Sequence, residues 1–137
     1  MTQIRDVMTQ NPSSCAPSTA VVEAAKVMAR EDVGAVPVVE GDRLVGVVTD
    51  RDVVVRVLAE ERDPQATTVG EIVSSDVVSV APDAGLDEAL RLLARHQVRR
   101  LPVVEGDRLV GIVAQADVAR HGDDSQTGQV VEQISQP

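Results

Sequence analysis

The chain has 137 residues, which is enough for one compact domain or for two very small ones. Its net charge of −9 argues against binding to nucleic acid or docking on an anionic membrane, because both partners require a basic face. The chain contains no Phe, Trp or Tyr and a single cysteine, Cys15, so the core must be aliphatic and an intrachain disulfide is excluded.

No segment is apolar enough for a signal peptide or long enough for a membrane span. We therefore expect a cytoplasmic protein without a membrane partner.

The first predicted elements form the series β-α-β-β-α. An extended segment at 13–16 precedes a helix whose apolar residues recur with helical spacing: Val21, Ala24, Ala25 and Met28. Two apolar strands, Val36–Val39 and Leu44–Val48, follow and are joined by the hairpin turn 40–43. A second helix begins near Asp50 and carries Val53, Val54, Val57 and Leu58.

The same series then repeats. The ten residues PVVEGDRLVG occur at 37–46 and again at 102–111, and an offset of 65 keeps the rest of the chain in register without a gap. The second copy has an extended segment at 77–81 and a helix with Leu86, Ala89, Leu90 and Leu93. We therefore predict an α+β protein of two units, 4–60 and 69–121, with a linker at 61–68, packed about a pseudo-twofold axis. The polar tail 122–137 carries Val130, Val131 and Ile134 as a weak last helical turn.

This order, with the run h-P-V-V-x-x-x-x-h-V-G-h-h-T-x-x-D in which h is apolar, resembles the cystathionine-β-synthase-type (CBS) domain. Two copies in register resemble the small bacterial stress-response proteins that consist of one CBS pair, or Bateman module. The resemblance implies clefts between the units that take adenosine nucleotides such as AMP, ADP or ATP. It also implies frequent dimerisation of such pairs.

The first unit supplies Thr49 and Asp52 where a strand ends and a helix begins. Thr49 or Asp50 is suited to capping that helix, which is a purely structural role. The resemblance implies a binding role instead: the Thr49 hydroxyl and backbone N–H groups face a phosphate, and Asp52 accepts hydrogen bonds from both ribose hydroxyls.

The second unit keeps Asp117 but has Ala114 at the threonine position, which removes one hydroxyl contact. It also has Arg99 and Arg100 where the first unit has Gly34 and Ala35. The resemblance implies that this arginine pair reaches the phosphates of the nucleotide held by Thr49 and Asp52, because a guanidinium donates two parallel hydrogen bonds. The alternative is a solvated patch that pairs with surface acids.

The adenine base has no aromatic side chain to stack on, so we expect an aliphatic slot with Val98 as one wall. His96 and His121 show no metal-ligand spacing, and Cys15 has the pattern of a packing residue. No catalytic set or phosphate-binding glycine loop is visible, so we expect neither a metal nor an enzyme.

Together these features predict a regulatory module that binds an adenosine nucleotide, forms a homodimer and signals occupancy to an unknown protein partner. The alternative is a CBS-scaffold interaction protein that binds no nucleotide and whose Arg and Asp residues form internal ion pairs.

Overall fold

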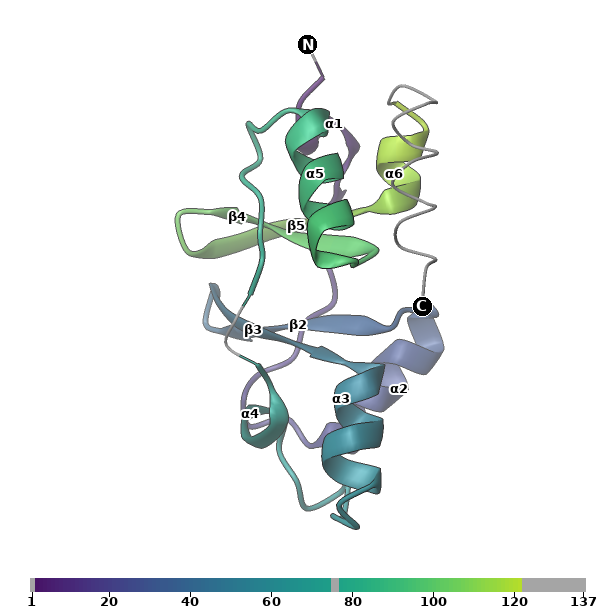
Figure 1. The fold of residues 1–137 in the computed structure, drawn as a ribbon. Helices are drawn as coiled ribbons and strands as arrows, with labels where there is room; N and C mark the ends of the chain where they lie inside the picture. Colours follow the sequence, from purple (N-terminus) through teal and green to yellow (C-terminus); the bar gives the residue numbers. More distant parts are fainter. Residues whose placement is uncertain (1, 75–76, 122–137) are drawn as a thin grey trace. The chain divides into compact units, whose positions relative to one another are not determined.

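The computed structural model describes residues 2–74 and 77–121, which form two compact units. The described residues within 13–77 form one unit, and residues 2–12 together with residues 78–121 form the other. Figure 1 shows the elements of each unit. The predicted weak helical turn at Val130, Val131 and Ile134 lies outside the described residues.

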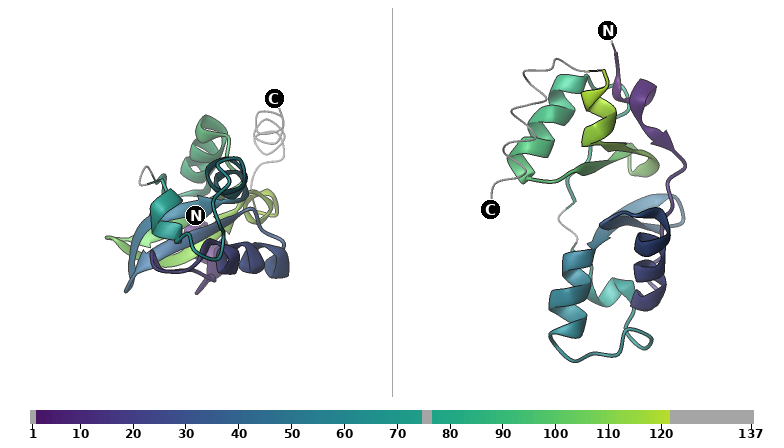
Figure 2. Two further views of the ribbon diagram at one scale, coloured as in Figure 1. Left: turned by 90° about the horizontal axis from the view of Figure 1, so that it is seen from below. Right: turned by 90° about the vertical axis from the view of Figure 1, so that its right-hand side faces the viewer.

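In the unit of residues 13–77, helix α2 (Val21–Glu31) leads into the antiparallel hairpin of β2 (Ala35–Glu40) and β3 (Arg43–Thr49). Helix α3 (Asp50–Val53) follows at once and continues as the π-helix η1 (Val54–Leu58). A short helix, α4 (Val69–Ile72), completes the unit. Figures 1 and 2 show α2, α3 and α4 on one side of the hairpin.

The other unit repeats this arrangement. Helix α5 (Leu86–His96) leads into the hairpin of β4 (Arg100–Glu105) and β5 (Arg108–Ala114), and helix α6 (Gln115–Ala119) follows. Helix α1 (Ile4–Val7) and strand β1 (Thr9–Gln10) complete it, with β1 antiparallel to β5. Helices α1, α5 and α6 lie on one side of the hairpin (Figures 1 and 2).

The predicted series β-α-β-β-α is confirmed in both repeats. The extended segments appear as parallel bridges from Cys15 to Val38 and from Val80 to Val103. Both hairpins turn through a glycine with positive φ, 64° at Gly41 and 67° at Gly106, a conformation that glycine adopts without a steric penalty.

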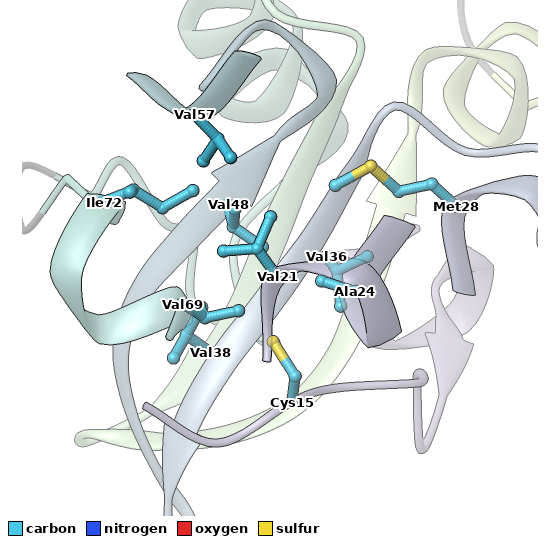
Figure 3. Close-up of a cluster of buried hydrophobic side chains, with 10 residues drawn as sticks. All are labelled: Cys15, Val21, Ala24, Met28, Val36, Val38, Val48, Val57, Val69 and Ile72. Atoms are coloured by element: carbon cyan, nitrogen blue, oxygen red, sulfur yellow. The ribbon is translucent and has the colours of Figure 1, made fainter. Parts of the chain in front are cut away.

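Each unit has its own aliphatic core. Figure 3 shows the core of residues 13–77, in which side chains from α2, β2, β3, η1 and α4 meet. Its buried members are Cys15, Val21, Ala24, Met28, Val36, Val38, Val48, Val57, Val69 and Ile72. The other core is built in the same way around Ile4, Leu93, Leu101, Val103 and Val113. Burial of apolar surface on one side of each hairpin therefore holds each unit together.

The short helices α1 and α4 are not part of the predicted series, and each packs with the repeat that the sequence division does not assign to it. Ile4 is fully buried in the core of the second repeat, and Val69, the residue 65 positions later, is fully buried in the core of the first. The predicted ranges 4–60 and 69–121 each begin with one of these helices, whereas the compact unit of residues 13–77 includes α4 and the other unit includes α1.

Candidate functional site

Thr49 and Asp52 form a reciprocal pair at the start of α3. The Asp52 backbone N–H donates to Thr49 Oγ1 at 3.1 Å, and the Thr49 N–H donates to Asp52 Oδ2 at 2.9 Å. Thr49 is the N-cap, as the structural alternative predicted, and Asp50 is the first helical residue. These bonds satisfy backbone donors that the first helical turn leaves unpaired, and they fix the orientation of the Asp52 carboxylate.

The second oxygen of Asp52 faces Arg56. Arg56 Nε lies 3.9 Å from Asp52 Oδ1, and Arg56 Nη1 donates to the Ile72 carbonyl oxygen at 2.6 Å. The Asp52 side chain is 16% exposed, and that of Arg56 is 49% exposed. Arg56 lies in η1, so the π-helical turn is the element that positions its guanidinium between Asp52 and the end of α4.

Asp117 occupies the equivalent place in the second repeat. The Ala114 N–H donates to Asp117 Oδ2 at 2.8 Å, so the carboxylate keeps its half of the pair although Ala114 offers no hydroxyl in return. Arg120 Nη2 donates to Asp117 Oδ1 at 3.4 Å from a side chain that is 71% exposed. Each aspartate therefore uses one oxygen to hold the start of its helix and turns the other toward an arginine that follows it in the chain.

Arg56 and Arg120 are not among the site residues predicted from the sequence. The available signal was their spacing, four residues after Asp52 and three after Asp117, which places opposite charges on one helical face.

Arg99 and Arg100 lie beside the start of α6 within their own unit. The Gln115 N–H donates to the Arg99 carbonyl oxygen at 2.8 Å, and Arg100 pairs with Ala114 across the hairpin. Leu101 is buried in the core, so Arg100 points to the opposite side of the strand. Arg99 is exposed and Arg100 half-buried, and neither side chain forms an ion pair within residues 2–74 and 77–121.

The structure thus brings Thr49 and Asp52 into contact and places Arg99 and Arg100 near Ala114. Val98 is half-buried and packs against the core of its unit. The assignment of Val98, Arg99 and Arg100 to the same ligand as Thr49 and Asp52 stays a prediction.

The remaining candidate ligands for a metal do not gather in the described part of the chain. His96 and His121 are exposed, and no group of three or more His, Cys, Asp and Glu side chains suited to a metal ion occurs there. Burial raises the pKa of the Cys15 thiol to about 11, and its Sγ lies 3.8 Å from the Pro37 carbonyl oxygen. Cys15 is therefore a protonated packing residue. Among the described helices, none is long and apolar enough to cross a membrane.

Comparison with known proteins gives the family. The CBS domain model matches residues 4–59 and 69–124. The CBS domain-containing protein YhcV of Bacillus subtilis is 44% identical over 119 residues, which cover 87% of this chain and 84% of YhcV. Hypoxic response protein 1 of Mycobacterium tuberculosis is 39% identical over 138 residues, covering 100% of this chain and 96% of that protein.

Solved structures agree with these relatives. The crystal structure of Hypoxic Response Protein I with two coordinated zinc ions has a TM-score of 0.80 and 41% identity, covering 89% of this chain and 100% of that chain. The crystal structure of CBSX2 in complex with AMP has a TM-score of 0.76 and 30% identity, covering 88% of this chain and 96% of that chain. The predicted α+β fold is confirmed, and the chain belongs to the CBS domain family as a tandem pair of such domains.

Proposed function

We propose that this CBS pair is a cytoplasmic regulatory module that binds an adenosine nucleotide and signals its occupancy to a protein partner. The observation that carries the proposal is the Asp52 carboxylate, which is fixed through Oδ2 and whose Oδ1 lies 3.9 Å from Arg56 Nε, its one side-chain partner among the described residues. A fixed carboxylate oxygen is suited to accept a ribose hydroxyl without a further loss of side-chain entropy. The AMP complex of CBSX2 supports this class of ligand.

Arg99 and Arg100 are assigned to the phosphates. Their side chains form no ion pair within the described residues, so they are available to an anionic ligand. In a protein of net charge −9, such a local cationic pair is required to attract a nucleotide. Val98 is assigned to the wall of the base slot.

The site around Asp117 is expected to bind more weakly. The N-cap of its helix is Ala114, so the hydroxyl that Thr49 offers is absent. Its carboxylate is also closer to its arginine. Asp117 Oδ1 lies 3.4 Å from Arg120 Nη2, whereas Asp52 Oδ1 lies 3.9 Å from Arg56 Nε. A ligand hydroxyl at Asp117 would therefore compete with an existing charge-assisted hydrogen bond.

A second candidate function is an interaction protein that keeps the scaffold and binds no nucleotide. The contacts of Asp52 with Arg56 and of Asp117 with Arg120 favour it, since they give both aspartates an internal partner. Calorimetric and thermal-shift titration with AMP, ADP, ATP and adenosine separates the two functions. Stabilisation by the phosphorylated ligands supports the first, and no shift at millimolar concentration supports the second.

The matched variants Asp52→Ala and Asp117→Ala test the site. Each removes one carboxylate that accepts a helix-capping N–H bond, so their stability losses should be similar, about 0.5–2 kcal/mol. Asp52→Ala should abolish the tight phase of AMP binding, whereas Asp117→Ala should leave it in place. The reverse pattern would assign the stronger site to the second repeat.

Arg100→Ala tests the phosphate assignment with the same titration. It should weaken the binding of AMP, ADP and ATP by about tenfold or more and leave adenosine nearly unchanged, because charge-assisted hydrogen bonds contribute about 1.5–3 kcal/mol. The proposal includes no metal, so AMP binding should be the same with and without a chelator. The zinc ions belong to Hypoxic Response Protein I.

We also propose that the pair forms a homodimer, which is the commonest closed assembly of identical chains. Light scattering at tens of micromolar measures this directly, and a monomeric mass would contradict it.

A further inference from the structure

Arg56 contacts two separate parts of its own unit. Its Nη1 donates to the Ile72 carbonyl oxygen at 2.6 Å, and its Nε lies 3.9 Å from Asp52 Oδ1. The backbone that carries Arg56 is anchored, because the neighbouring Val57 is fully buried in the core that also contains Ile72 (Figure 3). One guanidinium therefore reaches from the proposed ligand site to the end of α4.

The end of α4 uses this guanidinium as a hydrogen-bond donor. Helix α4 is a single turn, which is not stable in isolation, and the Val73 N–H closes it by donating to the Val69 carbonyl oxygen at 2.9 Å. The last carbonyl oxygens of a helix have no partner within the helix, and Arg56 supplies the donor for that of Ile72. Withdrawal of the guanidinium would leave this carbonyl without its donor and weaken the turn.

The same turn leads toward the connection between the two units. Ser74 forms an antiparallel bridge with Val47 of β3, and residue 77 is the last of this unit. A change at Ile72 therefore acts on the part of the chain that continues into the second repeat.

The second repeat lacks this link. His121 stands at the position of Arg56, and its side chain is exposed. Asp117 has an arginine partner in Arg120, but among the residues that the structure describes the side chain of Arg120 contacts Asp117 alone. The carboxylate of the second repeat is therefore not joined to the short helix of its unit.

That short helix is otherwise the same in the two units. In α1 the Met8 N–H donates to the Ile4 carbonyl oxygen at 3.0 Å, and these residues stand 65 positions before Val73 and Val69. The chain thus contains one helical turn with an arginine at its end and a matched turn without one.

We propose that Arg56 is a positioning residue that couples occupancy of Asp52 to α4 and the segment 72–74. A ligand hydroxyl that donates to Asp52 Oδ1 takes the oxygen that faces the guanidinium. The attraction that holds Arg56 at the Ile72 carbonyl is thereby weakened, and the turn of α4 opens more often. The inference rests on the proposed nucleotide site and adds the contact through which its occupancy is passed on. Because such coupling is reciprocal, opening of α4 also favours the ligand.

Hydrogen exchange of the whole chain tests the link without any ligand. Asp52→Asn keeps a side-chain oxygen for the Thr49 N–H and removes the negative charge that faces Arg56. The Val73 N–H should then exchange about fivefold faster, the lower end of the usual range for coupled groups, because the side chains are partly exposed. The Val39 N–H, which is bonded elsewhere in the same unit, should change by less than about twofold.

Asp117→Asn is the matched control. It makes the same change in the second repeat, where Arg120 contacts the carboxylate but, within the described residues, not α1. Exchange of the Met8 N–H should stay within about twofold. An acceleration at Met8 as large as that at Val73 would overturn the proposal, because removal of the charge would then weaken the short helix without an arginine.

Arg56→Met separates the coupling from independent structural roles of the two residues. This variant alone should speed Val73 exchange by about fivefold, since the Ile72 carbonyl loses its donor. In the same background Asp52→Asn should add less than about twofold, because the carboxylate can no longer act through the guanidinium. Additive effects of the two substitutions would overturn the proposal.

AMP then tests the coupling in the wild-type chain. Saturating AMP should slow exchange at Val39, because a ligand of the native state stabilises it, and should speed exchange at Val73. In Arg56→Met it should slow both. Wild-type protein that binds AMP and slows both amides would overturn the coupling and leave the nucleotide site standing. Wild-type protein that binds no AMP would overturn the nucleotide site, and unchanged Val73 exchange in Asp52→Asn would overturn the link in either case.

Discussion

At the scale of single residues, the two repeats use the same aspartate with different surroundings. Asp52 and Asp117 both accept the N–H of the residue three positions earlier. The neighbouring arginines differ, since Arg56 also bonds a backbone carbonyl of α4, whereas Arg120 contacts the carboxylate from an exposed position. Identical capping bonds thus coexist with unequal surroundings for a ligand.

This difference predicts unequal effects of removing the two arginines. Arg56→Met should lower the free energy of unfolding by about 1 kcal/mol, because the Ile72 carbonyl loses its 2.6 Å bond. Arg120→Met should change it by less than about 0.5 kcal/mol, since a pair this exposed contributes little. Urea denaturation measures both. Equal losses would mean that the bond to Ile72 contributes nothing.

At the scale of elements, one glycine on each of β3 and β5 leaves room for a chain segment that packs closely against the strand. These glycines are Gly46 and Gly111. A Cβ at Gly46 would lie 2.6 Å from Val73 Cγ2 and 2.9 Å from the Ser74 carbonyl oxygen. A Cβ at Gly111 would meet Met8 Sδ and the Thr9 carbonyl oxygen at the same distances. The strands are therefore built for close backbone approach at these points.

Gly46→Ala should accordingly destabilise the protein by about 1–3 kcal/mol, the usual cost of overpacking a core. Gly85→Ala is the control, because a Cβ there would have no heavy atom within 4 Å and the first repeat has Ala20 at the equivalent position. Thermal denaturation compares them. A loss at Gly85 as large as that at Gly46 would show that close contact does not set the effect.

The longer helices and the hairpins were predictable from the sequence, because the periodicity of the apolar residues and the composition of the turns specify them. The four-residue helices α1 and α4 were missed, since one turn is too short to show a period. The spacing of Thr68 and Glu71 was the available signal: the Thr68 N–H donates to Glu71 Oε2 at 2.6 Å. No local pattern indicates which repeat such a helix packs against.

The candidate site was predictable to the same limited extent. The structural alternative offered Thr49 or Asp50 as the cap of this helix, and Thr49 is the residue at the N-cap. The spacing of Arg56 from Asp52 was visible in the sequence, but its contact with Ile72 was not predictable, because it joins residues 16 positions apart. The ligand roles of Thr49, Asp52, Asp117, Arg99 and Arg100 stay predictions.

At the scale of the whole molecule, each core contains a short helix that the sequence repeat assigns to the other unit. Ile4 and Val69 occupy equivalent positions and are both fully buried, but they belong to different cores. A destabilising substitution at Ile4 should therefore weaken the core of the second repeat.

Hydrogen exchange of the matched variants Ile4→Ala and Val69→Ala tests this. Ile4→Ala should accelerate exchange in β4 and β5, with a loss of about 2–5 kcal/mol in the free energy of unfolding that is typical of a large-to-small core change. Val69→Ala should accelerate exchange in β2 and β3 instead. Faster exchange in β2 and β3 after Ile4→Ala would contradict the observed division.

The same division has a consequence for biosynthesis. The ribosome delivers residues 13–77 as one uninterrupted stretch, so that unit has all its parts while the second repeat is still being translated. The other unit needs the α1 and β1 segment, which is translated before residues 13–77, together with β4 and β5, which are translated after them. The apolar Ile4 therefore stays without the sheet that covers it while the whole of residues 13–77 is translated.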